Sequence, residues 1–109
     1  MTKEIAGMDD CPPDPAPPEG SIVRQLTLSN KKGLHARASA RFVQTVQQFD
    51  AEVKVIRCGE TVGGDSIMSL LTLAVPCGST IQVSARGKDA EAALDALEKL
   101  LADRFGEDD

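Results

Sequence analysis

Four segments of the chain have the pattern of a β-strand, because they contain β-favouring residues beside turn residues or apolar residues that alternate with polar ones. The clearest run is residues 80–86, where Ile81, Val83 and Ala85 would lie on one face of a sheet. The predicted strands are residues 22–28, 51–57, 60–62 and 80–86. Because such alternation is typical of a sheet with one buried face and one solvated face, the pattern favours an antiparallel sheet.

Three other segments repeat their apolar residues at intervals of three or four, which is the period of a helix. The predicted helices are residues 36–48, 66–73 and 89–105. The buried stripe of the first would be Ala38, Phe42, Val46 and Phe49, and that of the last Ala90, Leu94, Leu97 and Leu101. The element order βαββαβα predicts an α/β (α+β) fold. We expect an open-faced sandwich, with a four-stranded antiparallel sheet and three helices on one face.

Turn and cap residues stand between these elements. Cys58 and Gly59 separate the second and third predicted strands and predict a tight hairpin turn. Either Asp65 or Ser66 can cap the second helix, because each side chain can accept a hydrogen bond from the first turn. Gly106 suits the position just after the last helix.

The N-terminal part of the chain has a different composition from the rest. Residues 1–20 contain five of the six prolines and five acidic residues, with few apolar residues to bury. We therefore expect residues 1–20 to be a disordered, Pro-rich acidic tail. Residues 21–109 then form one small domain.

Charge is distributed unevenly along the chain. The net charge is −5 overall, but residues 21–86 carry +4. Lys31, Lys32, Arg37 and Arg41 belong to this basic part, which suits phosphate and an acidic partner surface. The overall negative charge and the presence of only three aromatic residues disfavour a nucleic-acid partner.

Membrane, metal and disulfide chemistry find little support in the sequence. No segment resembles a signal peptide or a membrane span, so we expect a cytoplasmic protein without membrane insertion. Cys11, Cys58 and Cys77 are widely spaced, form no C-x-x-C pair and accompany a single histidine. This pattern fits neither a zinc site nor a disulfide framework, so reduced thiols and no metal are expected.

The run Gly33-Leu34-His35-Ala36-Arg37 holds the residues best suited to chemistry. His35 stands where a predicted loop becomes a helix, and there the unpartnered N–H groups and the helix dipole attract an anion. Arg37 adds a guanidinium that can bind phosphate. Together, the imidazole, the unpartnered N–H groups and the arginine indicate a phosphoryl acceptor. By position alone, a single histidine at a helix start is more often a cap or a surface residue.

The run G-L-H-A-R, followed by D-S-I-M at residues 65–68, resembles the HPr family, the histidine-containing phosphocarrier proteins of the bacterial phosphotransferase system. The resemblance covers about residues 21–105 and implies the same open-faced sandwich. It implies that His35 accepts a phosphoryl group on Nδ1 from an enzyme I-type phosphohistidine donor, ultimately from phosphoenolpyruvate. His35 would pass the group to an EIIA-type protein, and Arg37 would stabilise it. Such a carrier is not an enzyme and needs no cofactor or metal.

Two further roles come from the same resemblance. Ser66 matches the serine that an HPr kinase/phosphorylase phosphorylates in some relatives, although this serine would cap its helix in either case. Partner proteins would dock on a patch that contains Ala36, Arg41, Ile67, Met68 and Leu71. Helical spacing alone is equally consistent with burial of the last three residues.

One position departs from the family pattern. Ala38 stands where relatives usually have proline after H-A-R, and the run H-A-R-A-S is more similar to the nitrogen-related, regulatory branch of the system than to the sugar-transport branch. A hypothesis from another class is a regulatory binding module whose phosphorylation state selects its targets with little phosphate flux. No heptad repeat is present, so a monomer is expected.

Overall fold

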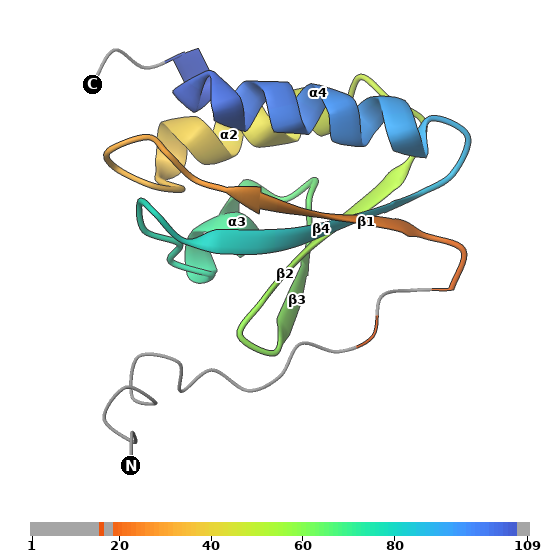
Figure 1. Cartoon of the computed structure of the whole chain (residues 1–109), viewed down its shortest axis with the longest axis horizontal. Coiled ribbons are helices and arrows are strands. Elements are labelled where there is room, and N and C mark those ends of the chain that lie inside the picture. Colours follow the sequence, from red (N-terminus) through yellow and green to blue (C-terminus); the bar gives the residue numbers. More distant parts are fainter. Residues whose placement is uncertain (1–15, 17–18, 107–109) are drawn as a thin grey trace.

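The protein has a four-stranded sheet, and its strands and helices follow one another along the chain in the order that the sequence predicts. The structure is a computed structural model that describes residue 16 and residues 19–106. The strands are β1 (Ile22–Thr27), β2 (Glu52–Arg57), β3 (Glu60–Gly63) and β4 (Thr80–Arg86), and the helices are α2 (Ala36–Val46), α3 (Ile67–Thr72) and α4 (Ala90–Ala102). The strand order is β1-β4-β2-β3, and every neighbouring pair is antiparallel (Figure 1). The predicted βαββαβα fold is confirmed.

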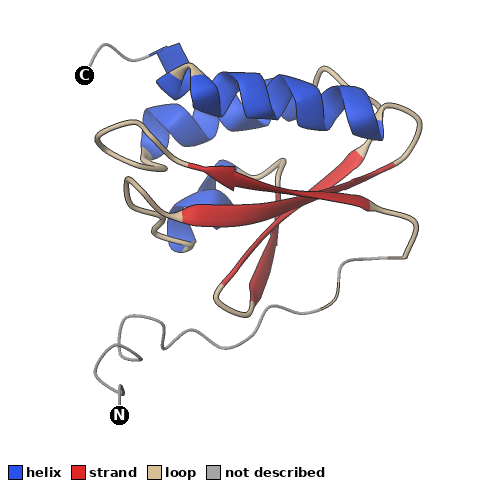
Figure 2. Ribbon diagram, in the orientation of Figure 1, coloured by secondary structure: helices blue, strands red, loops and turns tan. Residues whose placement is uncertain are grey.

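One face of the sheet forms the core together with the helices (Figure 2). Ile81, Val83 and Ala85 of β4 are buried on this face, as their alternation predicts. The same hydrophobic cluster contains residues from each helix, among them Phe42 of α2, Leu70 of α3 and Leu97 of α4. All three helices therefore pack against the same face of the sheet, and α2 and α4 also contact each other.

Two helices end earlier than the apolar pattern predicts. α2 ends at Val46, with Gln47 as its C-cap. α4 ends at Ala102, because Arg104 and Phe105 adopt left-handed backbone angles with φ of 52° and 57°. This turn returns the Phe105 side chain to the core, where it is 1% exposed. Burial of a large aromatic side chain offsets the cost of the left-handed backbone, so the predicted helix through residue 105 is wrong in its last turn.

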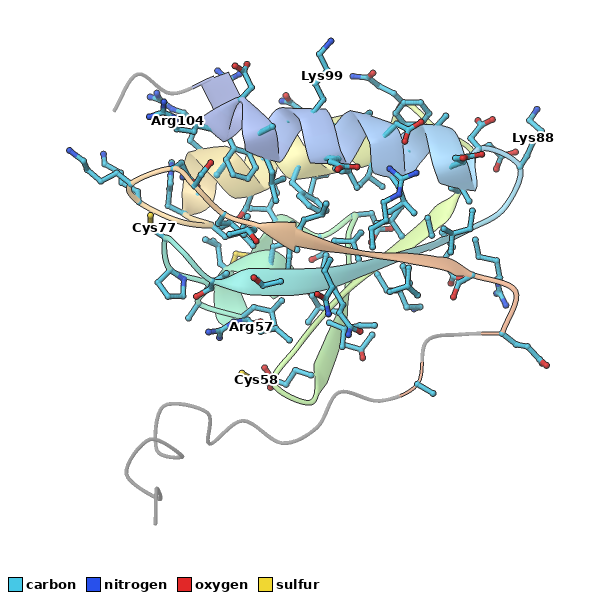
Figure 3. The ribbon with its side chains drawn as sticks, in the orientation of Figure 1. Arg57, Cys58, Cys77, Lys88, Lys99 and Arg104 are labelled. Atoms are coloured by element: carbon cyan, nitrogen blue, oxygen red, sulfur yellow. The ribbon has the colours of Figure 1, made fainter. Side chains whose placement is uncertain are left out.

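The β2–β3 hairpin has the tight turn that the sequence predicts, but its cysteine does not have the predicted reduced thiol. Cys58 and Gly59 both have positive φ, 52° and 79°, as a two-residue hairpin turn requires. Cys58, at the tip of the hairpin (Figure 3), is disulfide-bonded, so the prediction of reduced thiols is wrong at this position. Cys77 is a free, exposed thiol, and Cys11 lies outside the described residues.

Some expectations concern absences or residues without a described structure. Within the described part of the chain, no helix has the length and apolar character needed to cross a membrane. The same part contains no group of three His, Cys, Asp or Glu side chains arranged to hold a metal ion. The predicted disordered tail lies outside the described residues, apart from positions 16, 19 and 20.

Candidate functional site

His35 is the N-cap of α2. Its backbone is extended, with φ of −85° and ψ of −173°, and its carbonyl accepts the first helical hydrogen bond from Ser39 N at 2.8 Å. The ring bends back over the helix start, where Nδ1 accepts a hydrogen bond from the backbone N–H of Arg37 at 3.2 Å. A nitrogen that accepts this bond presents a lone pair, not a proton, to the first turn. Nδ1 thus lies at the positive end of an eleven-residue helix.

The loop before His35 is fixed by contact with a distant segment of the chain. Leu34 donates its backbone N–H to the carbonyl of Val75 at 2.9 Å. Gly33 has a φ of +66°, and a Cβ at this position would stand 2.3 Å from the Val75 oxygen and 2.9 Å from Pro76 Cα. Only glycine fits such a conformation and such a close approach. The backbone around His35 is therefore set by packing against residues 75–76.

The sequence does not predict these partners. Gly33 ends a turn-like run of residues before the helix, but nothing in that run indicates contact with Val75. A glycine two residues before a helix cap signals a positive φ. No pattern in the sequence links it to a carbonyl more than forty residues further on. Within the loop, Asn30 Nδ2 donates a second hydrogen bond, to the Gly33 carbonyl at 2.7 Å.

The basic residues near His35 are arranged on the outer side of α2. Arg37 and Arg41 are both exposed, and Lys31 and Lys32 are exposed in the preceding loop. Arg37 donates its backbone N–H to His35 Nδ1 directly, in addition to the guanidinium charge that the sequence predicts. Arg41 lies beside the C-terminal turn, with Nη1 3.3 Å from the position of a Cβ built on Gly106. This end of α2 is accordingly a site that suits an anion.

The second motif lies at the start of α3, which contacts α2. Ser66 is the N-cap of α3, and its Oγ accepts a hydrogen bond from the Ser69 N–H at 3.3 Å, so of the two candidate caps the serine is the one that is used. Met68 is 71% exposed and Ile67 is 39% exposed. The core residue of this helix is Leu70, which is fully buried.

The other residues predicted for the docking patch differ in how far they are exposed. Ala36 is exposed at the first position of α2, and Leu71 is half-buried in α3. Of the predicted patch, only Ile67 and Met68 are large apolar side chains that are exposed. Exposed apolar side chains at a helix start are typical of a contact surface for another protein.

Comparison with known families identifies the chain. A family model described as "PTS HPr component phosphorylation site" matches residues 22–103. The chain belongs to the HPr family of phosphocarrier proteins. The matched range covers the whole described fold from β1 to the end of α4, including both helix caps.

Individual HPr-family members agree with this assignment. The chain is 45% identical over 86 residues to the phosphocarrier protein HPr of Cupriavidus necator, covering 79% of this chain and 97% of that one. It is 39% identical over 86 residues to the phosphocarrier protein NPr of Shewanella violacea, covering 79% and 94%. Among solved structures, HPr-C-His from Thermoanaerobacter tengcongensis matches with a TM-score of 0.77 at 38% identity and covers 80% of this chain and 98% of that one.

Membership in the HPr family determines the general kind of chemistry. The protein is a phosphocarrier of the phosphotransferase system, and not an enzyme with a substrate of its own. A carrier must accept a phosphoryl group and release it again to another protein. A nucleophile at a helix start, accessible to partner proteins, meets both requirements.

Proposed function

We propose that His35 is the phosphoryl acceptor and that Nδ1 is the atom that forms the new bond. The hydrogen bond from Arg37 N–H to Nδ1 supports this assignment, because an accepting Nδ1 carries no proton and its lone pair points at the helix start. This hydrogen bond must break before Nδ1 can attack. In the transfer, Nδ1 attacks phosphorus, an N–P bond forms, and the N–P bond of the donor's phosphohistidine breaks. The donor imidazole leaves with the electron pair of that bond.

The start of α2 would stabilise the phosphorylated form. When Nδ1 carries a phosphoryl group, it can no longer accept from Arg37 N–H, and that donor becomes available to a phosphoryl oxygen. The helix dipole and the exposed Arg37 guanidinium add positive charge at the same place. Because this charge is already in place before transfer, the site needs little rearrangement.

The partners in this proposal are proteins at both steps. An enzyme I-type protein, charged from phosphoenolpyruvate, would donate to His35, and an EIIA-type protein would receive. Both would dock on a surface formed by Ala36 and Arg41 of α2 together with Ile67, Met68 and Leu71 of α3. The contact between the two helices supports such a surface, which would combine apolar side chains with basic charge. The carrier would need no cofactor.

Ser66 is the proposed regulatory position. A kinase/phosphorylase acting on this serine would place a charge of about −2 at the cap of α3, directly before the exposed Ile67 and Met68. An acidic partner that docks on this surface would be repelled. Regulation would thus act on docking and leave the chemistry at His35 intact.

The remaining assignments complete the proposal. Residues 21–109 would be the carrier domain, acting as a monomer in the cytoplasm, and residues 1–20 an N-terminal extension. Ala38 follows H-A-R where many relatives have proline, and this favours the nitrogen-related, regulatory branch. The similarity to an NPr protein supports that branch, and the similarity to HPr proteins supports the sugar-transport branch.

The experiment is a transfer reaction with the full chain. Wild type and a His35→Ala variant are incubated with phosphoenolpyruvate and an enzyme I-type donor, once from each branch, and intact masses are measured. We expect wild type alone to gain one phosphoryl group that acid removes, as for an N–P bond. Because the chain has a single histidine, an acid-labile group in wild type that is absent from His35→Ala belongs to His35.

Two outcomes would contradict the carrier mechanism at His35. One is absence of transfer from both donors to a wild-type protein that is folded by its melting curve. The other is equal labelling of wild type and the variant. If His35→Ala fixed one binding state towards a partner without any loss of phosphate flow, the regulatory binding module would be the better description.

A further inference from the structure

The first turn of α2 contains a buried serine. Across the described residues of this helix the buried side chains are Ala38, Ser39, Phe42, Val43 and Val46, and among them only Ser39 is polar. Its side chain is 0% exposed. A buried hydroxyl without a hydrogen bond costs free energy, and alanine would fill the same place with a higher helix propensity. A serine at this position is therefore expected to use its hydroxyl.

The hydroxyl of Ser39 bonds to a carbonyl outside the helix. Ser39 Oγ donates to Leu34 O at 3.4 Å. A helical serine commonly bonds a carbonyl three or four residues before it, whereas this acceptor is five residues before it, in the loop. Leu34 is only 4% exposed, so its carbonyl is buried and needs a donor. Within the described part of the chain, Ser39 Oγ is the one donor found for this carbonyl.

The backbone N–H of the same serine bonds to the next carbonyl along the chain. Ser39 N donates to His35 O at 2.8 Å. The carbonyls of Leu34 and His35 stand on the two sides of the His35 Cα, so Ser39 holds the peptide before the histidine and the peptide after it. The orientation of these two peptides sets the φ and ψ of His35, −85° and −173°. Ser39 thus fixes the direction in which the His35 side chain leaves the backbone.

The other hydrogen bonds of the loop act at different points. Leu34 N donates to Val75 O at 2.9 Å. Gly33 O accepts from Asn30 Nδ2 at 2.7 Å and from His35 N at 3.0 Å. These bonds hold the loop before α2, which lies beside the loop before β4 (Figure 1). None of them holds a carbonyl that adjoins the His35 Cα.

Loss of the hydroxyl would leave the Leu34 carbonyl to a competing donor. The first N–H groups of a helix have no acceptor within the helix, and in α2 the third of them belongs to Ala38. A Leu34 carbonyl without its hydroxyl partner can turn towards that N–H, and the helix then begins one residue earlier. His35 would leave the cap position. Its Nδ1 would separate from the Arg37 N–H, from which it now accepts at 3.2 Å.

We propose that Ser39 is a positioning residue for phosphoryl transfer at His35. Its hydroxyl and its N–H hold the two carbonyls that flank the histidine, so that Nδ1 stays at the start of α2. This role rests on the proposed function of His35 as the acceptor. Because Ser39 is buried, it touches neither a phosphoryl group nor a partner protein and acts through the histidine. Its effect belongs to the chemical step (kcat) and not to docking (KM).

The first test examines the position of the histidine without phosphoryl transfer. Hydrogen exchange of the Arg37 N–H is measured by NMR in wild type, Ser39→Ala, Ser39→Thr and Thr45→Ala. Thr45→Ala is the matched control, because Thr45 Oγ donates to the Arg41 carbonyl at 2.9 Å, in the last turns of the same helix. We expect exchange about tenfold faster in Ser39→Ala, where this N–H loses its acceptor, and unchanged exchange in the other two variants. Equal exchange in wild type and Ser39→Ala would overturn the proposal.

The second test measures transfer to the same proteins from an enzyme I-type donor charged with phosphoenolpyruvate. We expect kcat to fall about tenfold in Ser39→Ala with KM within about twofold of wild type, because a displaced nucleophile slows the chemical step. Ser39→Thr keeps the hydroxyl, so its kcat should stay within about threefold of wild type, as should that of Thr45→Ala. A wild-type kcat in Ser39→Ala, or an equal fall in Ser39→Thr, would contradict a positioning role of the hydroxyl.

Melting temperatures complete the comparison. Ser39→Ala should melt within about 4 °C of wild type, so that slow transfer does not reflect loss of the fold. A larger decrease that Ser39→Thr shares would assign a purely structural role to the serine and overturn the proposal. If wild type itself accepts no phosphoryl group, the carrier mechanism at His35 fails, while the exchange of the Arg37 N–H still decides whether Ser39 holds the histidine in place.

Discussion

α2 and α3 both begin at a polar side chain that accepts a hydrogen bond from the first turn of its own helix. His35 Nδ1 accepts from Arg37 N at 3.2 Å, and Ser66 Oγ accepts from Ser69 N at 3.3 Å. Glycines precede both caps and come close to other parts of the chain, Gly33 to Val75 and Gly64 to Val53. Locally, the two helix starts therefore follow the same rules of capping.

What differs is what surrounds each cap. α2 has eleven residues, a preceding loop bonded to Val75, and exposed basic side chains in its first two turns. α3 has six residues and exposes Ile67 and Met68 in its first turn. A fixed loop and positive charge suit a site of chemistry. A short helix with exposed apolar side chains suits contact with partners. The same local motif thus serves two tasks, and variants at each helix start should separate them.

The largest effect is expected from Gly33→Ala, which disrupts the fixed loop before α2. A Cβ at this position would meet the Val75 carbonyl at 2.3 Å with φ at +66°, so the loop must move. We expect a loss of about 3 kcal/mol in the free energy of unfolding, measured by urea denaturation. Gly78→Ala is the matched control, because Gly78 has φ of +87° but no atom within 4 Å of its built Cβ. It should lose only about 1 kcal/mol, and equal losses would show that the contact with Val75 is unimportant.

Arg37→Ala should weaken the chemistry at the same helix without unfolding it. The guanidinium is exposed, and the backbone N–H that bonds His35 remains in the variant. We expect the rate of phosphorylation by an enzyme I-type donor to fall about 30-fold, because one positive group near the phosphoryl oxygens is lost. Quenched-flow labelling measures this rate. Lys99→Ala, an exposed change on α4, serves as control, and an equal fall in both would assign the effect to overall charge.

Ser66→Asp should impair docking at α3 while it preserves the cap, since aspartate is as good an N-cap as serine. The added charge lies directly before Ile67 and Met68. We expect the KM of the donor enzyme for this protein to rise about tenfold, with little change in kcat. Ser66→Ala separates the two roles, because it removes the cap without adding charge. It should lower stability by about 1 kcal/mol and leave the KM near that of wild type. A rise of KM in Ser66→Ala as large as in Ser66→Asp would contradict a charge mechanism.

The smallest effect is expected from Met68→Ala. Met68 is 71% exposed, so the free energy of unfolding should change by less than about 0.5 kcal/mol. The donor's KM should rise about threefold, because an apolar contact with the partner is lost. Leu70→Ala, two residues further on, gives the opposite pattern: it lies in the core and should cost about 3 kcal/mol of stability. An unchanged KM in Met68→Ala would place the docking surface elsewhere.

The amount that could be predicted from sequence differs between the fold and the site. The strand of residues 80–86 was predicted with its true bounds, since alternation is a local property that survives folding. The end of α4 was not, because the turn at Phe105 depends on a place in the core for its ring. At the site, a cap at His35 could be expected from neighbouring residues, and the cap of α3 could be narrowed to Asp65 or Ser66, of which the structure uses Ser66. The dependence of Gly33 on Val75 could not, because no local pattern records it.

By itself, the sequence determined which segments are helices and strands, the order in which they follow, and that a polar side chain begins both α2 and α3. These features depend on residues within a few positions of one another, which is why a linear pattern contains them. Only the tertiary structure decided that β4 lies between β1 and β2 and that Leu70 is the core residue of α3. It also decided that Val75 fixes the loop before His35. Each of these depends on contacts between residues far apart in the chain, and packing selects such contacts only when the whole domain has folded.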